Sequence, residues 1–395
     1  MSGQHCLSSL KTMSWKCRWI TSLLYSSTAI AYAKSASGVS TSQTENESVW
    51  AAMQVPFPEL TGLKLESRSE TAPFLLDSFL GGSAPHLRFF ELNSIPFPGL
   101  PNLLLSATHL VTLYLFGIPQ SAYISPEEMV TCLSVLTSLE SLFLAFESPQ
   151  SFPDQETRHP PPPTRSILPA LLVISFQGVH EYLEDLVARI DTPLCRWFST
   201  SFLNDIDFDT PQLMHFISRN QTFKIFKTNI VHVVFDSHAA WVELRSQAPN
   251  RDFEELKVEV LCRVPDGQLS FLTQICTSLH LFLTTEKLYI YEHQSSQLDW
   301  EDDIENVEWL ELLRPFTVVK DLYLSKQFAP RIAPALQELT GGRTTDVLPT
   351  VQNLFLEGFQ PSGFDQEIEG IRQFIFARQL TNHPVAISVW KRALW

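Results

Sequence analysis

The sequence predicts an α/β solenoid that has a parallel strand face on one side and helices on the other. Two observations carry this prediction. A short pattern with apolar residues at its first, fourth and sixth positions recurs from residue 60 to residue 356, and segments of helical character lie between the copies. One strand and one helix cannot bury both of their faces alone. Units of this kind must therefore stack side by side and share one interior.

The last two apolar positions of each copy alternate with outward-facing residues, which is the period of a half-buried strand. The clear copies are Leu60-Leu63-Leu65, Leu87-Phe90-Leu92, Leu110-Leu113-Leu115, Leu139-Leu142-Leu144, Leu171-Ile174-Phe176, Phe253-Leu256-Val258, Val319-Leu322-Leu324 and Val351-Leu354-Leu356. Thr285-Leu288-Ile290 fits with a polar first position, and Leu194 and Phe223 open weaker copies. The spacing averages about 29 residues and predicts about ten or eleven units.

The segments between the copies contain helix signals. Ser125 is a plausible N-cap before Pro126, apolar residues follow helical spacing in residues 180–190, and Pro334–Leu339 precedes a glycine pair. The architecture is therefore that of an irregular leucine-rich-repeat-like solenoid. It is irregular because the asparagine or cysteine that usually follows the last leucine is replaced, at Arg68, Ile95, Ile118 and Glu147. The alternative is an ordinary α/β domain whose buried strands resemble one another.

The domain prediction places a leader and linker in residues 1–50, poorly ordered or helical, and the solenoid in residues 51–395. A secreted protein is the alternative for the amino terminus, since basic residues precede an apolar stretch that ends in the cleavage-like triplet Ala31-Tyr32-Ala33. Asn46 and Asn220 lie in glycosylation sequons. The stretch is too short and too polar to span a bilayer.

Composition excludes several classes of partner. The formal net charge is -15, and binding to nucleic acid or to an anionic membrane surface needs positive charge. The six cysteines are dispersed without a C-x-x-C pair, so they indicate neither a disulfide framework nor a zinc site. We therefore expect no nucleic-acid partner, no membrane span, and a cytoplasmic or nuclear location.

The sequence contains no recognisable catalytic motif, phosphate-binding glycine loop or zinc-protease signature. Asp236-Ser237-His238 and Glu292-His293 each offer two metal ligands, which is too few to hold an ion. We expect no catalytic residue, no metal and no cofactor. A hydrolase whose site is assembled from distant residues is the enzymatic alternative.

The strand face opposite the core carries the most informative side chains. If Leu113 and Leu115 point inward, Tyr114 must face the concave surface. The equivalent position in successive units is aromatic in five of nine cases, which gives the candidate partner-binding residues Tyr114, Phe143, Tyr289, Tyr323 and Phe355. Rows of exposed aromatic rings are typical anchors for protein partners. The alternative is that the rings are covered by flanking segments or simply favour β-structure.

The sequence resembles the repeat region of F-box and leucine-rich-repeat-like proteins that are abundant in mushroom-forming fungi. The resemblance covers roughly residues 50–390, and it lies in PFPELTGLKL (56–65), DSFLGGSAPHLR (77–88), PFPGLPNLLLSATHLVTLYL (96–115), SAYISPEEMV (121–130), EYLEDLVARIDTP (181–193), FDTPQL (208–213) and FAPRIAPALQELTGGRTTDVLPTVQNLFLEG (328–358). It implies repeats that hold a ubiquitin-ligase substrate and an F-box that docks on a Skp-type adaptor. Residues 1–50 contain no leucine–proline start of an F-box.

The expected function is therefore a non-enzymatic protein-interaction module that presents its concave strand face to a protein substrate or ligand. Docking on a Skp-type adaptor is implied by the resemblance alone. The alternatives are a secreted repeat protein and a truncated relic that has lost its adaptor-binding part.

Overall fold

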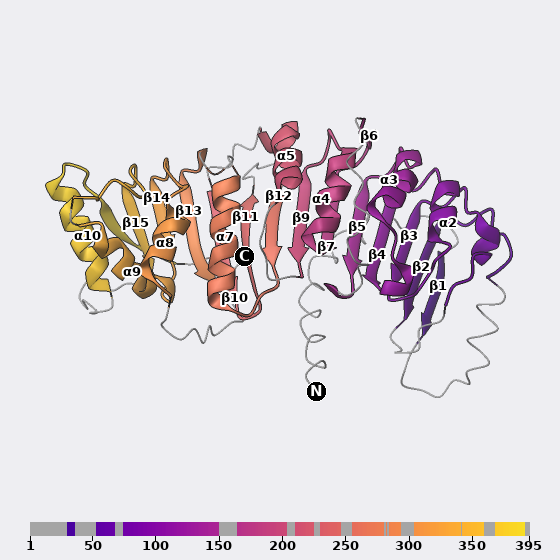
Figure 1. The fold of residues 1–395 in the computed structure, drawn as a ribbon, viewed down its shortest axis with the longest axis horizontal. Helices are drawn as coiled ribbons and strands as arrows, with labels where there is room; N and C mark the ends of the chain where they lie inside the picture. Colours follow the sequence, from indigo (N-terminus) through magenta and orange to yellow (C-terminus); the bar gives the residue numbers. More distant parts are fainter. Residues whose placement is uncertain are drawn as a thin grey trace.

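The computed structural model describes residues 30–35, 53–67, 74–149, 164–203, 210–224, 230–245, 255–279, 282, 284–293, 304–340, 342–358 and 368–391. Within these ranges one long sheet runs the length of the molecule, and a layer of helices covers one of its faces (Figure 1). This arrangement is the predicted α/β solenoid, with a large strand face and helices on the other side.

The described residues contribute fourteen strands to the sheet, in the order β1-β2-β3-β4-β5-β7-β9-β12-β11-β10-β13-β14-β15-β16. They are β1 (Ile30–Ser35), β2 (Gly62–Ser67), β3 (Phe89–Asn93), β4 (Thr112–Ile118), β5 (Ser141–Phe146), β7 (Val173–Gly178), β9 (Trp197–Phe202), β10 (Ile230–Asp236), β11 (Ala239–Arg245), β12 (Glu255–Val260), β13 (Lys287–Glu292), β14 (Asp321–Leu324), β15 (Asn353–Glu357) and β16 (Ala386–Trp390). A separate parallel pair joins β6 (Ser166–Ile167) and β8 (Ile190–Asp191).

Helices connect most successive strands and pack side by side on one face of the sheet (Figure 1). The α-helices are α2 (Leu100–Ser106), α3 (Pro126–Val135), α4 (His180–Arg189), α5 (Pro211–Arg219), α6 (Gln221–Lys224), α7 (Pro265–Ser278), α8 (Asn306–Leu313), α9 (Phe328–Glu338) and α10 (Glu369–Leu380). Two short 3-10 helices, η4 (Phe79–Gly82) and η5 (Gln120–Ala122), stand between strands near the amino-terminal end.

The repeated leucines share one continuous interior. Leu113 pairs in register with Leu142, and Leu322 pairs with Leu354, although about 180 residues of sequence separate the two pairs. All four side chains are at most 2% exposed and belong to the same apolar cluster. The prediction of stacked units with a common core is confirmed.

Local sequence signals explain the helix boundaries only in part. α3 begins where the sequence predicts, because the Ser125 side chain accepts a hydrogen bond from the Glu128 N–H at 3.2 Å and Pro126 occupies the first helical position. α9 begins at Phe328, six residues before the predicted start, and contains Pro334. Its Ile332, Ala333, Ala335 and Leu336 are buried, so packing offsets the proline's missing N–H.

The centre of the sheet departs from the parallel pattern. β11 is antiparallel to both of its neighbours, β10 and β12. After β9 the chain passes over two strand positions to form β10, turns back through β11 and returns as β12 beside β9. Helix α7 then packs on β11 and β12, and β13 pairs with β10. The sheet is therefore a solenoid interrupted by a three-stranded meander.

The two weaker copies are placed differently from their predicted starts. Leu194 is 54% exposed, and the neighbouring Cys195 is fully buried and takes the first core position before β9. Phe223 is fully buried in α6, and the following strand begins only at Ile230. Neither of these two predicted starts was correct. The unit before β9 begins one residue later, and a shift of one residue exchanges the inner and outer faces of a strand. Phe223 packs into the core from a helix rather than opening a strand.

The sheet also extends into the range predicted as leader. β1 pairs in parallel with β2, so residues 30–35 join the solenoid sheet rather than lying outside it. Most of the apolar stretch before Ala31 lies outside the described residues, as does Asn46. In the part of the chain that the structure describes, no helix is long and apolar enough to cross a membrane.

We predict that Leu142→Ala lowers the free energy of unfolding by about 2–5 kcal/mol, because it removes a fully buried side chain from the shared interior. Leu194→Ala is the matched control, and its effect should stay within about 0.5 kcal/mol because that leucine is exposed. Urea-unfolding midpoints of the two variants test the register. Equal midpoints for the two variants would contradict it.

Candidate concave interaction surface

The strand face that carries no helices presents one continuous row of side chains. Each strand contributes its central outward residue, and the parallel and antiparallel pairings all keep these residues directly opposite one another. From β2 to β16 the row reads Lys64, Glu91, Tyr114, Phe143, Ser175, Ser199, Lys257, Glu243, His232, Tyr289, Tyr323, Phe355 and Ser388.

Four rings in the carboxyl-terminal half of this row form a stack, which we call the aromatic ladder: His232, Tyr289, Tyr323 and Phe355. The ring centroids are 4.8 Å apart between His232 and Tyr289, 4.0 Å between Tyr289 and Tyr323, and 4.3 Å between Tyr323 and Phe355. The interplanar angles are 19°, 7° and 6°. This spacing follows the strand separation of about 4.8 Å, so in-register pairing itself stacks the rings.

The other two predicted residues form a second cluster near the amino-terminal end of the sheet. Tyr114 and Phe143 meet edge to face with centroids 4.4 Å apart, and Phe89 and Phe116 pack against Tyr114. Such tilted contacts are favourable because the positive ring edge meets the negative face. Tyr114 is only 9% exposed, which makes it more enclosed than the other predicted anchors.

Polar residues occupy the middle of the concave face, and their charges are paired. The Lys257 Nζ lies 3.1 Å from the Glu259 carboxylate and 4.4 Å from the centre of the Trp241 ring. Arg245 is paired with the carboxylate of Glu243, which is 2% exposed. The surface therefore consists of two aromatic regions separated by a charge-neutralised centre.

The five predicted residues thus do not form one patch. Phe143 lies six strand positions from Tyr289 and Tyr114 lies seven, or about 29 Å and about 34 Å along the sheet. The expected neighbours Tyr289 and Tyr323 do stack directly. Sequence reasoning missed His232 because the unit was placed at Phe223. The available signal for this hairpin was a pair of apolar-rich segments with polar residues between them, in residues 230–245, joined by a short Asp-Ser-His turn.

Burial keeps the ladder uncharged. Burial, and secondarily the positive charge of Arg245, lower the pKa of His232 to about 4. The Tyr291 hydroxyl lies 3.2 Å from the Nδ1 atom of this histidine. Desolvation also raises the pKa of Tyr289 and Tyr323 above the usual tyrosine value. Near neutral pH the ladder therefore offers neutral rings to a ligand.

The two pairs considered as metal ligands come together without forming a metal site. Asp236 ends β10 and His293 follows β13, and the His293 Nδ1 lies 3.3 Å from the Asp236 carboxylate. The Asp236 Oδ1 also accepts hydrogen bonds from the Ser237 hydroxyl at 3.2 Å and the His238 N–H at 3.3 Å. Among the described residues, no group of three or more histidine, cysteine, aspartate or glutamate side chains is arranged to hold a metal ion.

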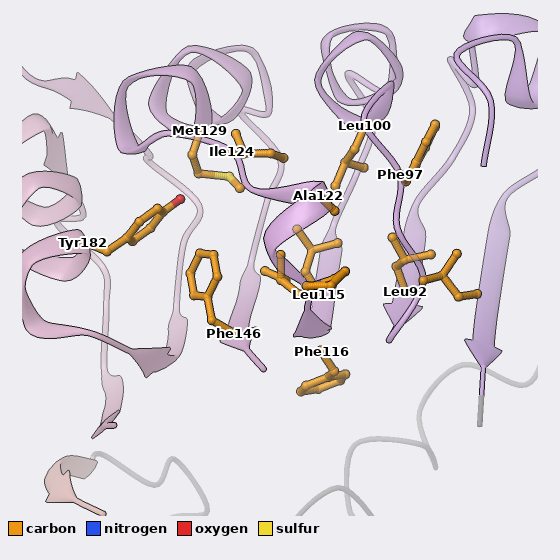
Figure 2. Close-up of a pocket in the computed structure, with 13 residues that line it drawn as sticks. Leu92, Phe97, Leu100, Leu115, Phe116, Ala122, Ile124, Met129, Phe146 and Tyr182 are labelled. Carbon is orange, nitrogen blue, oxygen red and sulfur yellow. The ribbon is translucent and has the colours of Figure 1, made fainter. Parts of the chain in front are cut away.

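An apolar cavity lies near the carboxyl ends of β3, β4 and β5, beneath α2 and α3 (Figure 2). Figure 2 shows Phe146 and Tyr182 on one side of it and Leu92 and Phe97 on the other. Its free volume is about 10 Å³, which is room for about one water molecule. The Tyr182 hydroxyl is the sole side-chain oxygen or nitrogen among its lining residues, so the cavity offers no acid–base pair for chemistry.

Three features bear on the secretion alternative. Asn220 is 5% exposed, and its amide nitrogen donates to the carbonyls of Thr192 at 3.1 Å and Cys195 at 3.2 Å. A glycan on this amide would require those bonds to break. Cleavage after Ala33 would remove most of β1. The cysteines at positions 132, 195, 262 and 276 are buried and form no disulfide bond.

No protein-family model matches the chain, and no curated protein matches its sequence. Among solved structures, the chain is similar to the leucine-rich repeat-containing protein LegL7 from Legionella pneumophila, with 11% sequence identity and a TM-score of 0.32. The match covers 82% of this chain and 93% of that chain. The description of the fold as a solenoid rests on the strand register and the shared core.

We predict that the free energy of unfolding decreases as the pH is lowered from neutral, and that His232 is responsible for part of this decrease. The unfolded chain has a histidine pKa of about 6.5, whereas the folded value is about 4, so the unfolded state binds more protons between these values. The stability that depends on a neutral His232 is fully present above pH ~6.5. Lowering the pH toward 4 should remove about 1–3 kcal/mol of the free energy of unfolding.

Urea midpoints measured between pH 7.5 and 4 should therefore decrease less steeply for His232→Gln than for the wild type. The readout is the slope of the urea midpoint against pH, because a pH-independent loss of stacking energy lowers every midpoint without changing this slope. His215→Gln, at an exposed position on α5, is the control. Parallel pH profiles for the wild type and His232→Gln would contradict the prediction.

Proposed function

We propose that this chain is a non-enzymatic protein-interaction module whose concave strand face holds a protein ligand. The observation that carries the proposal is the aromatic ladder, which stands in register on the face without helices and consists of half-buried rings. Aromatic side chains present a large apolar area at a small cost in conformational entropy, and they dominate the energetics of many protein interfaces.

The arrangement of the concave face suggests the shape of the ligand. The ladder and the Tyr114–Phe143 cluster lie at opposite ends of a polar middle region, so a partner that contacts both must extend across several strands. In the middle of the face, Lys257 pairs with Glu259 and Arg245 pairs with Glu243, so this region offers little net charge to a strongly charged ligand. A protein segment with spaced apolar anchors fits these features.

The finer proposal is that the module resembles the substrate-recognition repeats of an F-box protein. It rests on the sequence resemblance over roughly residues 50–390 and on a rigid repeat scaffold that presents a broad inner face. Affinity purification with mass spectrometry from the native cell, scored for Skp-type adaptor and cullin components, tests this membership. Recovery of substrates without these components would separate the interaction module from the ligase role.

We predict that Tyr289→Ser, Tyr323→Ser and Phe355→Ser together abolish partner capture while the fold survives. Each hot-spot truncation commonly costs about 2 kcal/mol or more, so capture should fall by well over about tenfold. A pulldown compared with wild type measures the loss, and circular dichroism and thermal melting check the fold. The variant residues lie on the concave side and leave the inner leucine rows intact.

Phe376→Ser provides the matched control for this experiment. Phe376 is 62% exposed on α10, on the helix layer, so its loss should leave capture unchanged. If the triple variant retains every partner at the wild-type level, the concave face is not the binding surface.

A further inference from the structure

The last strand of the sheet folds an aromatic side chain over the ladder. The Trp390 ring centroid lies 5.6 Å from that of Tyr289, 5.7 Å from that of Tyr323 and 6.5 Å from that of Tyr291. The interplanar angles are 67°, 74° and 67°, so the indole stands nearly perpendicular to the stacked rings. Edge-to-face packing of this kind is a favourable aromatic arrangement.

The strand that carries Trp390 buries little apolar surface. Among the described strands, β16 lies at the edge of the sheet and pairs with β15 alone. Its residues Ala386 to Val389 are all exposed, including Ile387 at 37% and Val389 at 45%. Elements with little buried apolar surface open at a low cost in free energy. Trp390 can therefore leave the ladder without disturbing the shared core.

We infer that the aromatic ladder is a receptor for an aromatic side chain of the protein partner, and that Trp390 is its resident occupant. Trp390 packs against Tyr289 and Tyr323 in the same way that an incoming indole or phenyl ring would pack. The partner replaces this contact with its own ring, and β16 moves aside. The identity of the ligand as a protein rests on the proposed function.

The chemistry of the site supports a neutral aromatic ligand. Burial holds His232 in its neutral form near neutral pH by lowering its pKa, and it raises the pKa of both ladder tyrosines. Asp321, beside the ladder on β14, accepts a hydrogen bond from the Asn353 amide at 2.7 Å. The rings of the ladder therefore present uncharged aromatic area, on which an aliphatic side chain would gain area burial without edge-to-face contacts.

The test uses N-acetyl-tryptophanamide as the probe and N-acetyl-leucinamide as its aliphatic control, with binding followed by ligand-observed nuclear magnetic resonance on the full chain. An occupant that fills a site for about nine-tenths of the time lowers the apparent affinity about tenfold. Trp390→Ala should therefore bind the tryptophan probe about tenfold more tightly than wild type. Adding Tyr323→Ser should remove this gain, and the leucine probe should not distinguish the variants.

Trp197→Ala is the matched control, because Trp197 is a half-buried tryptophan on the same face in β9, away from the ladder. Its affinity for the probe should equal that of wild type. Trp390→Leu keeps an apolar side chain on β16 and should also gain affinity, which covers the case in which the alanine variant is poorly folded. Equal affinity of wild type and both Trp390 variants would overturn the inference, as would a gain that persists without Tyr323.

Failure of the proposed function gives a different result. In that case Trp390→Ala still binds the tryptophan probe more tightly than wild type, but the ladder variants capture the same partners as wild type. This result would overturn the assignment of a protein ligand. If only the role of Trp390 is wrong, the probe gain is absent while the variant lacking Tyr289, Tyr323 and Phe355 still loses its partners.

Discussion

The structure depends on in-register pairing of strands whose side chains alternate between two faces. Because each pairing keeps equivalent residues opposite one another, Leu113 and Leu142 extend one apolar interior while Tyr114 and Phe143 extend one outer row. The same hydrogen bonds that align the core also set the ring spacing of the ladder. A slip of one residue in any strand would turn leucines outward and rings inward, so the core and the surface are specified together.

The concave face follows from this constraint and from the uneven distribution of residue types along it. Aromatic rings gather in β4–β5 and in β13–β15, where parallel neighbours bring identical positions within stacking distance. The middle strands carry Lys257, Glu243 and Glu259, which neutralise one another or a neighbour. A rigid sheet thus holds two apolar regions at a fixed separation, and a partner gains most by matching that separation rather than by adapting to a flexible surface.

The periodic part of the sequence predicted the fold well because each copy of the pattern encodes its own strand. The paired leucines and the contact between Tyr289 and Tyr323 follow directly from that pattern. The central meander could not be inferred from the repeat, since its strands pair outside the order of the chain. For the same reason His232 was missed. Trp390 was missed because its contact with Tyr289 reaches across three strand positions, which no local pattern records.

The central meander also alters how the chain finds its structure. Regular neighbours such as Leu113 and Leu142 are 29 positions apart, whereas Trp197 pairs with Glu255 and Ile230 pairs with Lys287, at about twice that separation. Closing longer loops costs more entropy and slows the pairing that depends on them. The hairpin of β10 and β11 is local and can form by itself. Its docking between the strands on either side, β1–β9 and β13–β16, joins residues that are farther apart in the sequence than any regular neighbours. Both groups of strands can therefore nucleate before the centre joins them.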